Sequence, residues 1–210
     1  MDNKKELTYS EVIYLFAEKS VSERSRFVNY DTHPGGEKIS VTPLSHKMVI
    51  AALAFLVENG YIALSVKEVK KLFIIPGKDV FGKKLKDAGQ EVTGIEKVLL
   101  NNFKDEKEVS KAVYWLLDDD ETSPWGQVVY ISKHSLSEKG FLVLEKERKN
   151  IFTAKRHLFG EKNRETAKTF YEEAEKKLKQ FSEKADIYKL VEKAVKNGIA
   201  SRRARSSSDD

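Results

Sequence analysis

The sequence contains no cysteine, and only four prolines and four histidines occur among its 210 residues. Without cysteine, the protein has no disulfide, no thiolate zinc site, no iron–sulfur ligation and no cysteine nucleophile. No apolar run reaches the roughly 18 residues that a membrane-spanning helix needs, and charge begins at Asp2, so we expect neither a span nor a signal peptide. These absences favour a protein that is made and kept in the cytosol or nucleus.

Signatures of common catalytic sites are also missing. The sequence has no Gly-x-Ser-x-Gly elbow, no Gly-rich phosphate loop and no dinucleotide fingerprint. We interpret His134 and His157 as surface or hydrogen-bonded histidines, neither metal ligands nor general bases. The protein is therefore predicted not to be an enzyme and to need no cofactor or metal.

One short motif, His33-Pro34-Gly35-Gly36, is similar to the first haem-ligand motif of cytochrome b5-like domains. A haem held by two histidines needs a second one on a facing helix, and the nearest, His46, is poorly placed for that role. We therefore predict a turn at residues 33–36 and no haem.

Charge is distributed unevenly along the chain. Residues 146–205 carry 18 Lys and Arg against 9 Asp and Glu, although the whole chain has a net charge of only +5. Such asymmetry is typical of proteins that bind nucleic acid or an anionic membrane surface, and also of long solvated helices. Composition alone leaves both interpretations open.

Hydrophobic periodicity and capping residues predict a mainly α fold, a helical bundle around an apolar central helix with one or two short β-hairpins. Thr8 with Glu11, and Thr93 with Glu96, have the spacing of capping boxes. The predicted helices cover residues 8–20, 44–59, 93–103, 109–116, 123–139 and 161–198. The predicted strands cover residues 39–42, 61–64, 72–75, 141–144 and 151–153, with loops at 22–38 and 76–89. We expect one domain over residues 1–198, its last part a long basic helix, and a disordered Arg/Ser-rich tail over residues 199–210.

Two segments have the composition of a binding surface. In the loop at residues 76–89, lysines surround two apolar side chains, which is typical of a contact with anionic lipid. The predicted contact residues are Lys78, Phe81, Lys83, Lys84, Leu85 and Lys86. Alternatively, Phe81 and Leu85 simply cover the core. The second segment, a helix followed by a hairpin at residues 123–153, is typical of a winged-helix module, in which Lys133, His134 and Lys139 would face nucleic acid.

The order of several segments resembles the Golgi phosphoprotein 3 family over roughly residues 7–180. The resemblance depends on four stretches, which are residues 7–16, Leu53-Ala54-Phe55-Leu56-Val57-Glu58-Asn59-Gly60-Tyr61-Ile62-Ala63-Leu64, Val92-Thr93-Gly94, and Ser135-Leu136-Ser137-Glu138-Lys139-Gly140-Phe141-Leu142. Members of that family are mostly helical, with an apolar central bundle and an exposed β-hairpin. The eukaryotic members are peripheral Golgi proteins that bind phosphatidylinositol 4-phosphate and act as adaptors for membrane-resident glycosyltransferases.

The resemblance implies a cytoplasmic adaptor that is peripheral on a membrane, on the cytosolic face of the Golgi if eukaryotic, with an anionic lipid and a protein client as partners. The family's phosphate pocket uses one Trp and three Arg, at positions that fall here on Ser40, Val49, Gly126 and Val129. None of these matches. We therefore predict that Lys47, Lys133 and His134 bind the lipid headgroup, with a nucleic-acid-binding winged helix as the alternative. Against that alternative, the basic helix interleaves acidic residues such as Glu172 and Glu173, which a nucleic-acid surface would normally exclude.

Overall fold

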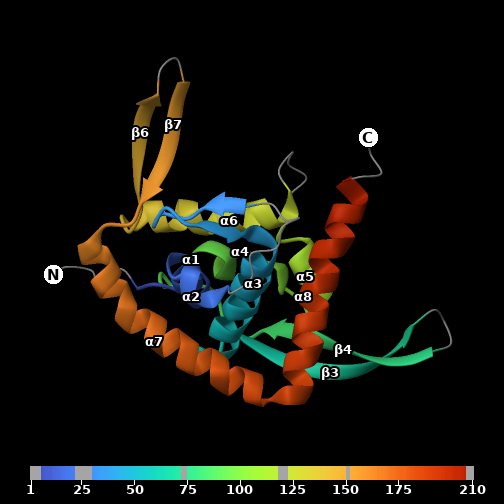
Figure 1. Ribbon diagram of the computed structural model, residues 1–210. Coiled ribbons are helices and arrows are strands. Elements are labelled where there is room, and N and C mark those ends of the chain that lie inside the picture. Colours follow the sequence, from blue (N-terminus) through green and yellow to red (C-terminus); the bar gives the residue numbers. More distant parts are fainter. Residues whose placement is uncertain (1–5, 22–29, 72–74, 118–122, 150–151, 207–210) are drawn as a thin grey trace.

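The computed structural model describes residues 6–21, 30–71, 75–117, 123–149 and 152–206 (Figure 1). In these ranges the chain forms mostly helices, joined by three small antiparallel sheets. The helices are α1 (Tyr9–Leu15), α2 (Ala17–Ser20), α3 (Val41–Glu58), α4 (Gly94–Asn102), α5 (Val109–Tyr114), α6 (Pro124–Glu138), α7 (Glu161–Glu183) and α8 (Ala185–Ser206). The strands are β1 (Tyr30–Thr32), β2 (Lys38–Ser40), β3 (Ile62–Lys71), β4 (Ile75–Lys84), β5 (Lys107–Glu108), β6 (Val143–Lys149) and β7 (Phe152–Leu158). The predicted mainly α class is confirmed.

Helix α3 is the centre of the core, as its apolar sequence predicts. It contacts α1, α4, α6, α7 and α8, and every side chain from Met48 to Leu56 is buried. By length and a mean hydropathy of 1.4 over 18 residues α3 could cross a membrane, but 67% of this stretch is buried inside the protein. Since other helices surround it, α3 is here a core helix (Figure 1).

Local capping residues fix several helix ends where the sequence predicts them. The Thr8 backbone N–H donates to Glu11 Oε2 at 2.9 Å before α1, and the Gly126 N–H donates to Ser123 Oγ at 3.2 Å at the start of α6. Gly60, with a φ of +67°, follows the last turn of α3. These bonds satisfy backbone groups that a helix end leaves without a partner.

The β3–β4 hairpin departs from the prediction. Strand β4 covers most of the segment predicted to be a loop at residues 76–89, and the strand predicted at 72–75 lies mainly outside the described residues. Gly82 on β4 is a site of close approach, because a Cβ there would lie 2.5 Å from the Phe103 ring. Pairing along β3 and burial of Val80 then hold the segment as a strand.

The C-terminal part is also different from the prediction. The single helix expected over residues 161–198 is divided at Lys184 into α7 and α8, and α8 continues to Ser206 through residues predicted to be disordered. This end of α8 has a surface to pack on, namely α5. Ile199 is fully buried, and the Arg202 guanidinium lies 5.0 Å from the Tyr114 ring centroid and donates to its hydroxyl at 3.2 Å.

Two hairpins project from the helical body in different directions (Figure 1). The β3–β4 arm (residues 62–84) leaves from the C-terminal end of α3, whereas the β6–β7 hairpin (residues 143–158) leaves from the C-terminal end of α6. The second hairpin confirms the prediction at residues 141–153 and is longer than expected. A third, short hairpin of β1 and β2 was predicted only as a loop and one strand.

Candidate functional site

The three residues predicted to bind a lipid headgroup do not form one site. Lys47 Nζ lies 3.1 Å from Glu175 Oε1 on α7, whereas Lys133 Nζ lies 2.7 Å from Asp31 Oδ2 on β1. His134 is exposed, and its Nδ1 lies 3.6 Å from Glu138 Oε2 one turn later. Each of the three side chains therefore already has a carboxylate beside it.

The six predicted membrane-contact residues lie on or just after β4, which is a strand instead of the predicted loop. Lys78, Phe81, Lys83 and Lys84 are on the strand, and Leu85 and Lys86 follow it. Phe81 is half-buried, with Lys67 Nζ 5.2 Å from its ring centroid, so it is neither freely exposed nor fully buried in the core. Leu85 is exposed, and Lys86 Nζ lies 4.1 Å from the centroid of the Tyr61 ring.

A pocket between α6 and β1 contains one of the predicted cations. Its cavity volume is about 250 Å³, and its lining residues are Tyr30, Asp31, Val41, Ser123, Gly126, Val129, Tyr130 and Lys133. Gly126 and Val129 are two of the positions that the family resemblance assigns to a phosphate pocket, and Val41 follows a third, Ser40. Ser40 and Val49 themselves are not among the lining residues, and none of the four positions carries the expected side chain.

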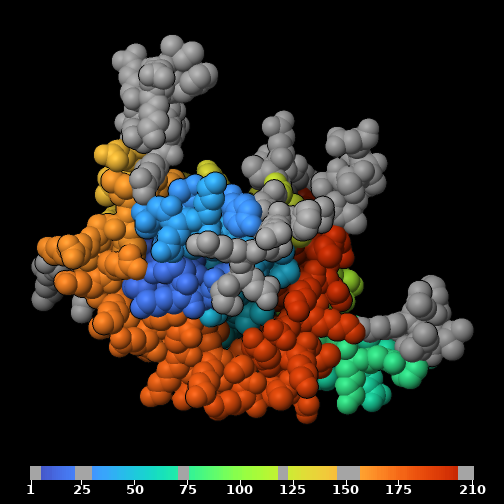
Figure 2. Space-filling view, viewed as in Figure 1, coloured from blue at the N-terminus to red at the C-terminus, as the bar shows by residue number. Residues whose placement is uncertain are grey.

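The base of the β6–β7 hairpin lies beside this α6–β1 pocket. His157 of β7 is close enough to the Asp31–Lys133 pair for both charges to act on it. Burial, with the positive charge of Lys133 second, lowers the pKa of His157 from its ordinary 6.5, and Asp31 opposes this only in part. His157 is therefore mainly neutral at pH 7. In Figure 2 the surface of β1 and β2 (light blue) borders that of the hairpin base (yellow to orange).

Exposed apolar side chains gather around the same pocket. Tyr30 and Tyr130, which line it, are 43% and 66% exposed, and Val143 and Leu144 at the start of β6 are 60% and 45% exposed. They are four of the seven large hydrophobic residues exposed among the described residues. Leu144 is the strand partner of His157 and shares its side of the hairpin, whereas Val143, one residue earlier, points to the other side. Burial of exposed apolar side chains against a partner is favourable, and such side chains around a pocket and the hairpin beside it are typical of an interaction surface. We call this surface the α6 face.

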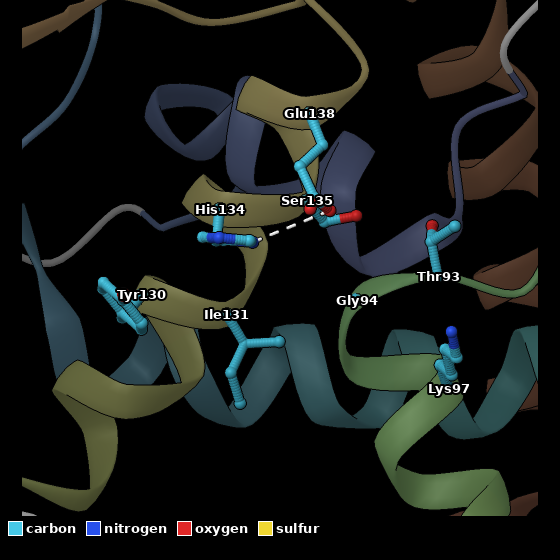
Figure 3. Close-up of a pocket in the computed structure, with 8 residues that line it drawn as sticks. All are labelled: Thr93, Gly94, Lys97, Tyr130, Ile131, His134, Ser135 and Glu138. Atoms are coloured by element: carbon cyan, nitrogen blue, oxygen red, sulfur yellow. Dashed lines mark ion pairs between the residues drawn. The ribbon is translucent and has the colours of Figure 1, made fainter.

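A second pocket lies on the other side of α6, against the start of α4 (Figure 3). Its cavity volume is about 320 Å³, and the residues that line it are Thr93, Gly94, Lys97, Tyr130, Ile131, His134, Ser135 and Glu138. Tyr130 borders both pockets. Ser135 Oγ at the edge of this second pocket donates to Glu11 Oε1 at 2.6 Å, which connects the pocket to a buried network of carboxylates.

That network joins α1, α4 and α6. Glu11 is fully buried and also accepts from Thr93 Oγ1 at 3.0 Å and Lys139 Nζ at 2.7 Å. Glu96 is fully buried and accepts from the backbone N–H and hydroxyl of Ser10 at 2.9 and 2.7 Å. The capping-box role predicted for Glu96 is therefore wrong, although Thr93 does precede the helix.

Glu96 is the most strongly perturbed of these groups. Burial, followed by the nearby Glu11 carboxylate, raises the pKa of Glu96 to about 7. The signal was present in the sequence, because Glu96 falls within the apolar stripe that buries Ile95, Leu99 and Leu100. Each carboxylate oxygen of Glu11 and Glu96 accepts at least one hydrogen bond, so the arrangement is suited to hold three helices together.

The predicted turn at residues 33–36 is confirmed. The Gly36 N–H donates to the His33 carbonyl at 2.7 Å, and His33 itself is buried. Its Nδ1 accepts from the Gly35 N–H at 3.2 Å, and its Nε2 lies 2.9 Å from the Tyr14 carbonyl oxygen, to which it donates. Both ring nitrogens are thus used within the protein.

Over the described parts of the chain, no group of three or more His, Asp or Glu side chains is placed to hold a metal ion. No protein-family model, curated protein or solved structure matches the chain significantly, so its resemblance to the Golgi phosphoprotein 3 family stays a prediction.

Proposed function

We propose that the protein is a non-catalytic, peripheral membrane-binding protein, adaptor-like, whose α6 face contacts an anionic lipid surface. The observation that carries this proposal is that the exposed Tyr30 and Tyr130 line a polar pocket, and that the exposed Val143 and Leu144 lie at the base of the hairpin that projects beside it. A membrane interface offers both an apolar layer for such side chains and charged groups for the pocket.

The charge of the β6–β7 hairpin supports this assignment. Its sequence from residue 143 to 158 contains five basic and two acidic residues. Each Lys or Arg near an anionic membrane contributes about 1 kcal/mol, and each fully buried Val or Leu side chain about 1.5–3 kcal/mol. Contributions of this size suit reversible association better than permanent anchoring.

The β3–β4 arm is the less favoured contact. It starts at the opposite end of α3 from the α6–β1 pocket (Figure 1), so a flat membrane under one of these surfaces does not meet the other. Its half-buried Phe81 offers less apolar surface than a freely exposed side chain would. We therefore place the lipid contact on the α6 face instead of on residues 78–86.

Nucleic-acid binding through a winged helix receives less support. Lys139, one of its predicted contacts, is only 10% exposed because it pairs with the buried Glu11, and Lys133 pairs with Asp31. Lys133 and Lys139 must therefore each break an ion pair with a carboxylate before they can bind phosphate.

Co-sedimentation with vesicles of graded negative charge tests the proposal, with a DNA shift assay at the same salt concentration beside it. The double variant Val143→Ser/Leu144→Ser should bind vesicles at least about tenfold more weakly than the parent, with unchanged thermal stability, since two exposed apolar side chains are lost. The matched control is Val66→Ser/Leu85→Ser, which removes one exposed Val and one exposed Leu from the β3–β4 arm and should bind as the parent does.

If Val66→Ser/Leu85→Ser weakened vesicle binding and Val143→Ser/Leu144→Ser did not, the membrane contact would lie on the β3–β4 arm. A parent protein that sediments with no anionic vesicle would refute membrane binding, and a shift of DNA by that protein would favour the winged-helix alternative.

A further inference from the structure

The charges that line the α6–β1 pocket balance each other. Lys133 Nζ lies 2.8 Å from Asp31 Oδ1 and 2.7 Å from Oδ2, and the two side chains remain 19% and 23% exposed. His157 adds little charge at pH 7, because burial and Lys133 lower its pKa. The described lining residues therefore present one carboxylate and one ammonium group, side by side.

This balance is unfavourable for a purely anionic headgroup. A phosphate monoester with about 1.5 to 2 negative charges would compete with Asp31 for Lys133 and would lie against a carboxylate of the same sign. Gly126 and Val129, at two positions where the family resemblance expects arginine, add no charge. The pocket thus lacks the cations that a phosphoinositide requires.

The pocket has separate features for a cation and for a phosphate. Tyr30 and Tyr130 border it with exposed rings, and the face of an aromatic ring attracts an ammonium group. Asp31 lies next to Tyr30 in the chain and adds a negative charge. On the α6 side, the Ser123 hydroxyl at the start of the helix and Lys133, ten residues further along it, also line the pocket, and Lys133 is the cation there.

We propose that the α6–β1 pocket binds a zwitterionic lipid headgroup, the phosphate ester of an amino alcohol, an inference that rests on the membrane-binding function proposed above. The phosphate lies toward Lys133 and the ammonium toward Asp31 and the two tyrosines. In this orientation the headgroup dipole runs antiparallel to the Asp31–Lys133 pair, so both contacts form while the pair is kept. The cavity of about 250 Å³ is small, below the ~300 to 1,000 Å³ of pockets for drug-sized ligands.

Titration of the full chain with soluble headgroups tests the pocket without a membrane. Glycerophosphocholine and glycerophosphoethanolamine, whose phosphate diester carries a single negative charge as in the lipid, should bind saturably, as measured by calorimetry or by NMR shifts, and choline or inorganic phosphate alone at least tenfold more weakly. Asp31→Asn should weaken the binding of glycerophosphocholine at least tenfold but strengthen the binding of inorganic phosphate, because a competitor for Lys133 is removed. The matched control Asp87→Asn, at an exposed surface pair with Lys84, should change neither.

If Asp31→Asn fails to fold, Tyr130→Ala provides the second test, since this ring is largely exposed and its loss should weaken the binding of glycerophosphocholine without loss of stability. Tighter binding of inorganic phosphate or an inositol phosphate than of glycerophosphocholine by the parent would overturn the inference. Unchanged affinity of Asp31→Asn for glycerophosphocholine would overturn it as well.

Vesicles separate this inference from the membrane proposal. Two vesicle mixtures are compared, and both contain the same amount of phosphatidylglycerol, which supplies negative charge without an ammonium group. The other lipid is phosphatidylcholine in the first mixture and a galactosyl diacylglycerol, which lacks phosphate and ammonium, in the second. The parent should prefer the phosphatidylcholine mixture severalfold, and Asp31→Asn should not. Equal binding to both mixtures overturns the headgroup inference and leaves membrane binding intact. Binding of soluble glycerophosphocholine without any vesicle binding refutes both the lipid source and the membrane proposal.

Discussion

Replacement of Glu96 by glutamine should remove a pH dependence of stability that one buried carboxyl group causes. Glu96 accepts hydrogen bonds from the N–H and hydroxyl of Ser10, and burial raises its pKa to about 7, with Glu11 as the second cause. Glutamine keeps both bonds, since its oxygen accepts from the N–H and its amide donates to the hydroxyl oxygen. The variant therefore imitates protonated Glu96 at every pH.

The direction in which stability changes with pH follows from the pKa of Glu96 in the folded and the unfolded chain. In the unfolded chain the Glu96 carboxyl has its ordinary pKa of 4.5, whereas the folded protein keeps the proton up to a pH of about 7. Between these values the unfolded chain binds fewer protons, so the free energy of unfolding falls as pH rises through this window. The fall approaches about 1.4 kcal/mol per pH unit, or about 3 kcal/mol in total.

Urea denaturation of parent and Glu96→Gln at pH 4.5, 6 and 8 measures this effect. Burial lowers the pKa values of His33 and His46, which changes stability with pH in the opposite sense, but both proteins share this term and it cancels in their difference. The difference should move in favour of the variant by about 3 kcal/mol from pH 4.5 to pH 8. Glu172→Gln, at an exposed position on α7, should show no such change. A difference for Glu96→Gln that stays constant within about 0.5 kcal/mol over this range would refute the reasoning.

Three further changes test the packing. Leu53→Ala should cost about 2–5 kcal/mol in chemical denaturation because Leu53 is fully buried in α3, and a cost below about 1 kcal/mol would place that helix at the surface. Lys139→Ala should cost about 3–5 kcal/mol, since it leaves Glu11 buried without its cation. Gly198→Ala should cost about 1–3 kcal/mol because its Cβ would lie 2.6 Å from a backbone carbonyl oxygen of α5, whereas Gly160→Ala, with open space around it, should cost less. Equal costs at the two glycines would show that α8 does not pack on α5 as described.

For the candidate site, the sequence predicted individual binding residues but not the charged residues that pair with them. Lys133 was predicted as a headgroup ligand, and it does line the α6–β1 pocket, but Asp31, 102 residues earlier in the chain, balances its charge. Lys47 was assigned to the same site and pairs with α7 instead. Periodicity shows which face of a helix is apolar, but it does not show which element covers that face.

The sequence by itself determined the helical class, the burial of α3 and the start of α6 at Ser123. These features depend on residues within one or two turns, whose spacing fixes the caps and the apolar stripes. Only the tertiary structure decided that β4 is a strand, that Glu96 accepts hydrogen bonds from Ser10 and that α8 continues past Gly198. The Glu96 and α8 contacts join residues more than 80 positions apart in the chain, whereas β4 pairs with β3 of the same hairpin. In each case the neighbour supplies the hydrogen bond or the buried surface that the local sequence lacks.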